Sequence, residues 1–273
     1  MNPARPMSFS AVLAWAACVF ILLNALVFGL AALRPNSLHD LVSLGTCEAL
    51  VFLILSALVL RVHNPESTLV QAFALRPAPA SLVIVCFAAG LCLRVPADFL
   101  RTLVETLAPT PSDVLLAEGE LLHYETPADL VKLLVVLAVA GPLVEELFYR
   151  GALFGPLLRA RGMVGAVVAT SLAFVLAHGQ WRDYPSLVLV AASLGYVRAA
   201  CGSLLPAYAL HVAFNLSAIW VSAVGIVGPT ESLTLSPALT ALAWALVFFL
   251  LTGVHRIAMR NALAIEARDE DVN

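Results

Sequence analysis

The chain has 273 residues, of which 61% are hydrophobic and only 12% are charged. An ordinary soluble domain has about 45–50% apolar and about 25% charged residues, so this chain has too little charge to cover a water-soluble body of its size. Its net charge of −3, with 15 basic residues, provides no basic surface for nucleic acid. The five cysteines include no CxxC pair, and we expect buried free thiols rather than disulfides or a structural zinc site.

Long apolar runs predict an all-α membrane protein, a polytopic helical bundle of about eight transmembrane helices. Each run is close to the roughly 20 residues that a helix needs to cross a bilayer. The expected segments are 9–33, 41–60, 80–97, 128–158, 163–181, 185–200, 203–227 and 235–255. The fourth segment is longer than a bilayer requires, and Pro142 within it predicts a kink or a break in the helix.

The distribution of arginine predicts the orientation of the chain. Counted as loop charges with the N-terminus in the cytoplasm, nine arginines lie on the inner side: Arg5, Arg61, Arg76, Arg159, Arg161, Arg198, Arg256, Arg260 and Arg268. The outer loops hold only four: Arg34, Arg94, Arg101 and Arg182. This agrees with the usual excess of positive charge on the cytoplasmic side, so we expect both termini in the cytoplasm. The polar connection at about 98–128 then faces outward. Ser112 could cap a short helix there, but a solvated loop is the preferred expectation.

Ionisable side chains inside the apolar runs are the strongest functional signal, because a charge in a bilayer is costly unless it faces a partner or a water-filled cavity. They fall into three groups, in the stretches GPLVEELFYRG of the fourth segment, FVLAHG of the fifth and HVAFN of the seventh. The polar residues of these stretches are Glu145, Glu146, Arg150, His178, His211 and Asn215.

Helical spacing separates the two glutamates. Glu146 and Arg150 are i, i+4, so they lie on one face of the helix and can neutralise each other. Glu145 is rotated by about 100° from Glu146 and cannot meet that arginine in the same way. We therefore expect Glu146 and Arg150 to have a supporting role and Glu145 to be free for chemistry. His211 and Asn215 are also i, i+4 and point into one space.

These side chains can perform acid–base chemistry on an acyl group. Glu145 could take a proton from a water molecule that His178 helps to orient. His211 and Asn215 could donate hydrogen bonds to the oxyanion of a tetrahedral intermediate. Phe174, one turn before His178, is a candidate apolar wall of the site. The alternative is a Zn²⁺ site with Glu145, His178 and His211 as ligands and a fourth position open to water, and spacing does not separate the two.

Each polar group also has a structural interpretation. A Glu–Arg pair in a membrane helix can be a packing clamp, and a lone histidine can be a hydrogen bond between helices. A purely structural role for all three groups in one small protein is a weaker interpretation than a functional site. Glu48 in the second segment is isolated, and we expect it to be structural or to face a cavity rather than to be catalytic.

Together the three motifs resemble the signature of the CPBP intramembrane proteases, also called the CAAX protease or Abi family. The residues that carry the resemblance are Glu145-Glu146-x-x-x-Arg150, Phe174-x-x-x-His178 and His211-x-x-x-Asn215, within about residues 128–220. The resemblance implies an eight-helix endopeptidase in which Glu145 is the general base and His178 is its partner on the water. It also implies an oxyanion hole of His211 and Asn215, and a glutamate-dependent site without an obligatory metal.

The resemblance divides the chain into three expected parts. Residues 1–127 would hold the N-terminal transmembrane helices and the outward-facing polar loop. Residues 128–227 would form the catalytic CPBP-type membrane core. Residues 228–273 would hold the last transmembrane helix and a short cytoplasmic tail.

The expected setting is a bacterial cytoplasmic (inner) membrane. Arginine makes up 14 of the 15 basic residues, which together with abundant alanine and leucine indicates a GC-rich bacterial genome. The expected partners are membrane lipids and a protein or peptide substrate with a lipid or apolar tail. Family relatives suggest C-terminal processing or sorting of surface proteins, or maturation of bacteriocins and other peptides. The alternative is a non-enzymatic immunity or scaffold protein of the same family.

Overall fold

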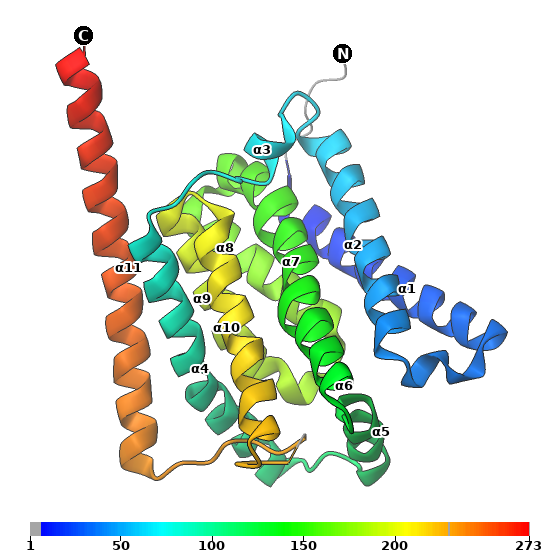
Figure 1. Cartoon of the computed structure of the whole chain (residues 1–273). Coiled ribbons are helices and arrows are strands. Elements are labelled where there is room, and N and C mark those ends of the chain that lie inside the picture. The colour runs from blue at the N-terminus through cyan, green and yellow to red at the C-terminus, as the bar shows by residue number, and fades with distance from the viewer. Residues whose placement is uncertain (1–6, 229, 273) are drawn as a thin grey trace.

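The computed structural model describes residues 7–228 and 230–272, with side chains up to residue 261 (Figure 1). Every regular element in this part of the chain is a helix, which confirms the all-α fold. Residues 1–6, 229 and 273, which belong to the expected N-terminal and C-terminal parts, lie outside the described residues.

Six helices in the described part of the chain are long and apolar enough to cross a membrane. They are α1 (Phe9–Leu33), α2 (Leu41–His63), α4 (Ala80–Leu107), α9 (Tyr184–Cys201), α10 (Leu204–Ala223) and α11 (Pro237–Val272). Their outer faces carry large apolar side chains such as Phe28 and Phe248, which are 63% and 72% exposed. These observations confirm a polytopic helical bundle.

The fourth and fifth expected segments are also helical, but they are divided into shorter elements. They consist of α6 (Pro127–Leu133), the π-helical stretch η2 (Leu134–Ala140), α7 (Gly141–Glu146), a second π-helical stretch η3 (Leu147–Leu153) and α8 (Phe154–His178). The chain turns at Gly162, whose φ of 70° and ψ of −178° are not helical. This turn separates the two segments between residues 158 and 163, as expected.

Pro142 does not break the fourth segment, because η2 accommodates it. The N–H of Gly141 donates to the carbonyl oxygen of Val136, five residues back. In the same pattern the carbonyl of Leu137 would accept from residue 142, and proline has no N–H to donate. The side chain of Asn215 supplies the missing donor, with Nδ2 2.8 Å from the Leu137 oxygen. Pro142 thus leaves the Leu137 carbonyl free to accept, and this carbonyl fixes the side chain of the motif residue Asn215.

The polar connection is more helical than the sequence suggested. Helix α4 continues past residue 97 to Leu107, because Asp98 is satisfied inside the bundle by Arg94 at 2.7 Å and by the backbone N–H of Leu233 at 2.8 Å. The expectation of a solvated loop is wrong, since α5 (Ser112–Leu122) occupies the connection. Ser112 makes no capping bond, because it is already inside the helix. The remaining short elements are η1 (Pro35–His39), α3 (Leu69–Ala72) and η4 (Trp181–Asp183).

Two clusters of buried apolar side chains form the core. One joins α1, α2, η3 and α8, and the other joins α4, α9, α10 and α11. Helices α4 and α10 pack so closely that a Cβ on Gly90 would lie 2.2 Å from the carbonyl oxygen of Leu210. In Figure 1, α3 and the far end of α11 lie at one end of the bundle, whereas α5 and the start of α11 lie at the other.

Candidate active site

The three polar motifs meet in one small chamber between the helices. A cavity of about 180 Å³ is lined by Glu145 of α7, His178 at the end of α8, and His211 and Asn215 of α10. The structure therefore brings together the four residues that the sequence singled out for catalysis. Phe174 lines the same cavity, one turn before His178.

The carboxylate of Glu145 lies between the two imidazole rings. One oxygen, Oε1, is 3.8 Å from Nε2 of His178, and the other, Oε2, is 3.6 Å from Nε2 of His211. The Glu145 side chain is 12% exposed, so it borders the cavity rather than the packed core. Both separations exceed a direct hydrogen bond, so Glu145 has no partner that fixes it as a structural group.

The backbone of α8 orients the ring of His178. Nδ1 lies 2.7 Å from the carbonyl oxygen of Phe174, and because a carbonyl only accepts, Nδ1 carries the hydrogen. In the neutral ring Nε2 then carries the lone pair that faces Glu145. The Phe174 ring packs against both imidazoles, with centroid distances of 4.5 Å to His178 and 5.9 Å to His211. Phe174 is therefore an apolar wall of the chamber, as its spacing predicted.

Glu146 is turned away from the cavity into the core. It and Arg150 are both fully buried, and Oε1 accepts from Nη1 of Arg150 at 2.8 Å. The guanidinium also donates to the carbonyl of Ala191 at 3.0 Å and lies 4.9 Å from the centroid of the Phe174 ring. The same Oε1 lies 3.1 Å from Nδ1 of His211. Glu146 thus neutralises the arginine and orients an imidazole that faces the other glutamate.

Helix α10 is joined to η2 by two side chains on one face. Asn215 donates to the Leu137 carbonyl, and the hydroxyl of Tyr208 donates to the carbonyl of Val139 at 3.1 Å. Tyr208, His211 and Asn215 are i, i+3 and i+7, so they share this face. The spacing was visible in the sequence, but Tyr208 was missed because tyrosine is common in membrane helices, above all near their ends, without any role in chemistry.

Two further residues near the site were given other roles by sequence reasoning. Glu48 of α2 lines the chamber beside Glu145, which bears out the expectation that it faces a cavity. Arg198 of α9 was counted as a loop charge, but it is only 7% exposed and its Nε donates to the carbonyl of Arg150 at 2.9 Å. Each lies on a different helix from the residue it approaches, so no spacing along the sequence indicated it.

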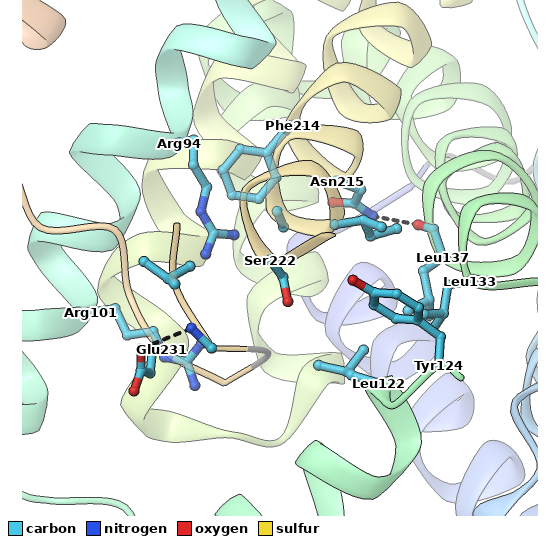
Figure 2. Close-up of a pocket in the computed structure, with 14 residues that line it drawn as sticks. Arg94, Arg101, Leu122, Tyr124, Leu133, Leu137, Phe214, Asn215, Ser222 and Glu231 are labelled. Atoms are coloured by element: carbon cyan, nitrogen blue, oxygen red, sulfur yellow. Dashed lines mark hydrogen bonds between the residues drawn. The ribbon is translucent and has the colours of Figure 1, made fainter. Parts of the chain in front are cut away.

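Two considerably larger cavities adjoin the chamber, and a third of about 190 Å³ shares His178 with it. One of the two, of about 540 Å³, is bordered by Glu145 and His178 and by apolar residues of α1 and α2, including Phe20, Leu23 and Phe52. The other, of about 300 Å³, is shown in Figure 2 and reaches the chamber at Asn215. Its lining is mixed, with Phe214 and Leu133 beside the charged or polar groups of Arg94, Arg101, Tyr124 and Glu231. Both larger cavities therefore have mixed linings. The described residues around the cavity beside α1 and α2 include no arginine or lysine, whereas those around the cavity of Figure 2 include two arginines.

The residue types of the site suit zinc, but the spacing of their side chains suits it less well. Glu145, His178 and His211 are donors that zinc commonly takes, and both imidazoles turn Nε2 toward the carboxylate. Within the described residues, however, no group of three His, Cys, Asp or Glu side chains is placed to hold a metal ion. Zinc binding would require these side chains to move closer together.

A protease family model matches the part of the chain that carries the motifs. Residues 127–217 match a family model named Rce1-like. Its description is type II CAAX prenyl endopeptidase Rce1-like. The match confirms the resemblance to the CPBP (CAAX protease) family over the part of the chain that carries all three motifs. Comparison with curated proteins and with solved structures finds no match. The apolar helices and the matched family together support an integral membrane protein.

Proposed function

We propose that this chain, whose residues 127–217 match a family of CAAX-type membrane proteases, is an intramembrane endopeptidase. It would hydrolyse a peptide bond in a membrane-proximal or lipid-anchored protein or peptide. The observation that carries the proposal is the carboxylate of Glu145, held between two imidazole nitrogens at 3.8 and 3.6 Å beside a cavity among membrane helices. A group committed to packing would be hydrogen-bonded and closed off, as Glu146 is.

In this proposal the peptide bond is attacked by a water molecule that Glu145 and His178 activate. The water oxygen bonds to the carbonyl carbon while its proton passes to Glu145. His178 accepts a hydrogen bond from the same water through Nε2, because its Nδ1 is committed to Phe174. The role of the imidazole is to hold the water in line with the carbonyl.

The oxyanion would form on the α10 side of the chamber. Asn215 uses one N–H on the Leu137 carbonyl and has a second N–H for the substrate oxygen. His211 donates through Nε2 when the ring is an imidazolium, because its Nδ1–H is directed at Glu146. The carboxylates of Glu145 and Glu146 lie on either side of that ring. Both donors are thus positioned by groups other than the substrate, as oxyanion stabilisation requires.

The cavity wall formed by α1 and α2, which is apolar apart from Asn24 and Glu48, supports a substrate that is apolar on one side of the scissile bond. A lipid chain or an apolar helix would occupy the space beside α1 and α2, and polar peptide would occupy the pocket of Figure 2. C-terminal processing of surface proteins and maturation of secreted peptides both provide such substrates. The setting we propose is a bacterial cytoplasmic membrane with both chain termini in the cytoplasm, and membrane lipid would form the surroundings of the substrate tail.

The proposal is tested by comparing protein termini in membranes of the native host. The host would carry the wild-type chain, Glu145→Gln or Glu66→Gln, at matched expression. Glu66 is an exposed glutamate outside the membrane helices, so its replacement controls for the loss of a charge. We expect new N- and C-termini with the wild-type chain and with Glu66→Gln that are absent with Glu145→Gln. Identical termini in all three, with folded protein present, would instead favour an immunity or scaffold protein.

A further inference from the structure

Glu48 lines the chamber together with Glu145, but the mechanism above gives it no part. Its side chain also borders the larger cavity beside α1 and α2, so it stands where the two spaces meet. Helix α2 comes this close because a glycine faces η2: a Cβ on Gly45 would lie 2.6 Å from Cγ1 of Val136. A Cβ on Gly141, one turn before Glu145, would lie 3.6 Å from Oε2 of Glu48. Small residues on both helices therefore bring the two carboxyl groups into one chamber.

The charges around Glu48 differ from those around Glu145. In the described part of the chain Glu48 has no hydrogen-bond or ion-pair partner, and the described residues that line its two cavities include no lysine or arginine. The titratable groups that face it are the carboxylate of Glu145 and the hydroxyl of Tyr149, with both of which it interacts electrostatically, and the imidazoles of His178 and His211 across the chamber. Both of those imidazoles are directed at Glu145.

Two carboxyl groups in one poorly hydrated space do not both ionise at low cost, so such a pair shares a proton. Oε2 of Glu145 lies 3.6 Å from Nε2 of His211, which is an imidazolium in the proposed mechanism, whereas Glu48 has no cation within ion-pair distance among the described residues. Glu145 is therefore the ionised member of the pair, and Glu48 is the member that holds the proton. A base and an acid at one substrate site are what amide hydrolysis needs, because the leaving nitrogen must be protonated.

We propose that Glu48 is a further catalytic residue, the acid that protonates the leaving nitrogen of the substrate. This inference rests on the proposed function. After water has attacked and given its proton to Glu145, the C–N bond breaks as the nitrogen takes the proton of Glu48 and departs as an amine. The other product is the carboxylic acid. Transfer of the proton from Glu145 to Glu48 then restores both groups, and no other reactant is consumed.

The test compares two leaving groups in one enzyme. The substrate is a synthetic peptide that spans the cleavage site found from the new termini, with its apolar tail, in phospholipid vesicles. The second probe is the acyl side of the same sequence as a 4-nitrophenyl ester, whose leaving group departs without a proton. Glu48→Gln should lower kcat for the amide by about 10²–10⁴-fold, the usual contribution of a general acid, and leave ester cleavage nearly unchanged.

Two further variants distinguish this proposal from the proposed function. Cys47→Ala, a buried neighbour on α2, should cleave both probes at the wild-type rate. Glu145→Gln should lose activity on both, because the water must still be activated. Equal losses on amide and ester in Glu48→Gln, or no loss on the amide, would overturn the role of Glu48 alone. Failure of the wild-type chain to cleave the amide would overturn the proposed function and with it the role of Glu48.

Discussion

Adjacent residues at the site have opposite surroundings. Glu146 is fully buried and bound to Arg150, whereas Glu145 is 12% exposed and faces the chamber. The difference follows from the rotation of about 100° per helical residue. The sequence predicted this division of the two glutamates. It did not predict that His211 would touch both, because the contact joins residues on two different helices.

We expect the buried ion pair to govern stability rather than chemistry. Arg150→Met would remove the closest counter-charge of the buried Glu146, and breaking a buried pair in this way costs about 3–5 kcal/mol. The melting temperature in detergent should fall sharply. Replacing both members, as Glu146→Gln with Arg150→Met, should restore part of the loss, since no uncompensated charge remains. An unchanged melting temperature in Arg150→Met would contradict a structural role for the pair.

Two variants on one face of α10 should separate catalysis from packing. Asn215→Ala removes the proposed oxyanion donor and should lower kcat by about 10²–10³-fold. Tyr208→Phe removes the bond to Val139 on the same face and should cost about 0.5–1.5 kcal/mol of stability with little change in kcat. Rates on the vesicle substrate and thermal unfolding measure the two effects. Equal kcat losses in both variants would indicate that Asn215 acts only by joining the helices.

At the scale of elements, the π-helical stretch η2 is the feature that shapes the site. It allows a proline within a long helix and leaves a carbonyl for Asn215 to bind. π-helical stretches are rare and often lie at functional sites. The sequence indicated Pro142 as a disturbance of the helix. It could not indicate that Asn215 would supply the missing donor, because this residue lies 78 positions from Leu137 in the sequence.

Pro142→Ala tests this arrangement directly. Alanine supplies an N–H that can bond within the helix and compete with Asn215 for the Leu137 carbonyl. We expect the melting temperature to be kept or raised, because alanine favours helix, while kcat falls as Asn215 loses its fixed position. Thermal unfolding and cleavage rate, measured on one preparation, check both effects. A variant with unchanged kcat would show that the site does not depend on this proline.

The close packing of α4 on α10 should be equally sensitive. Gly90→Ala places a Cβ 2.2 Å from the Leu210 oxygen, so the two helices must separate. Overpacking of this kind costs about 1–3 kcal/mol, and the melting temperature should fall. Because His211 follows Leu210 on α10, activity should fall as well. Gly253→Ala in α11 is the control, since nothing lies within 4 Å of its added Cβ; it should keep wild-type activity and a melting temperature at or above that of the wild type, because alanine favours helix.

At the scale of the whole molecule, the fold was more predictable than the neighbours of each residue. Apolar runs locate the membrane helices because the bilayer imposes their length and composition. Spacing also located the four residues of the chamber. It did not locate Glu48 at the same chamber, because periodicity indicates which residues share a face of one helix and not which helices are adjacent. The charge count likewise treated Arg94 and Arg198 as loop charges, although both side chains lie inside the bundle.

The mechanism also predicts the response to metal removal. We expect purified protein to cleave its substrate at the same rate before and after dialysis against a chelator, because in the proposed mechanism Glu145 and His178 activate the water without a metal. The measurement is the metal content of the preparation alongside its rate. Stoichiometric zinc that is lost together with activity, and restores activity when added back, would favour the alternative in which Glu145, His178 and His211 are ligands.

The most direct test of the central claim is the rate at which the purified chain in phospholipid vesicles cleaves the segment identified from the new termini. Glu145→Gln is compared with the wild-type chain after both are shown to have the same melting temperature. The proposed chemistry predicts cleavage at one bond by the wild-type chain and a loss of about 10²–10⁴-fold or more in the variant. Cleavage by the variant at the wild-type rate would contradict the claim that Glu145 activates the water.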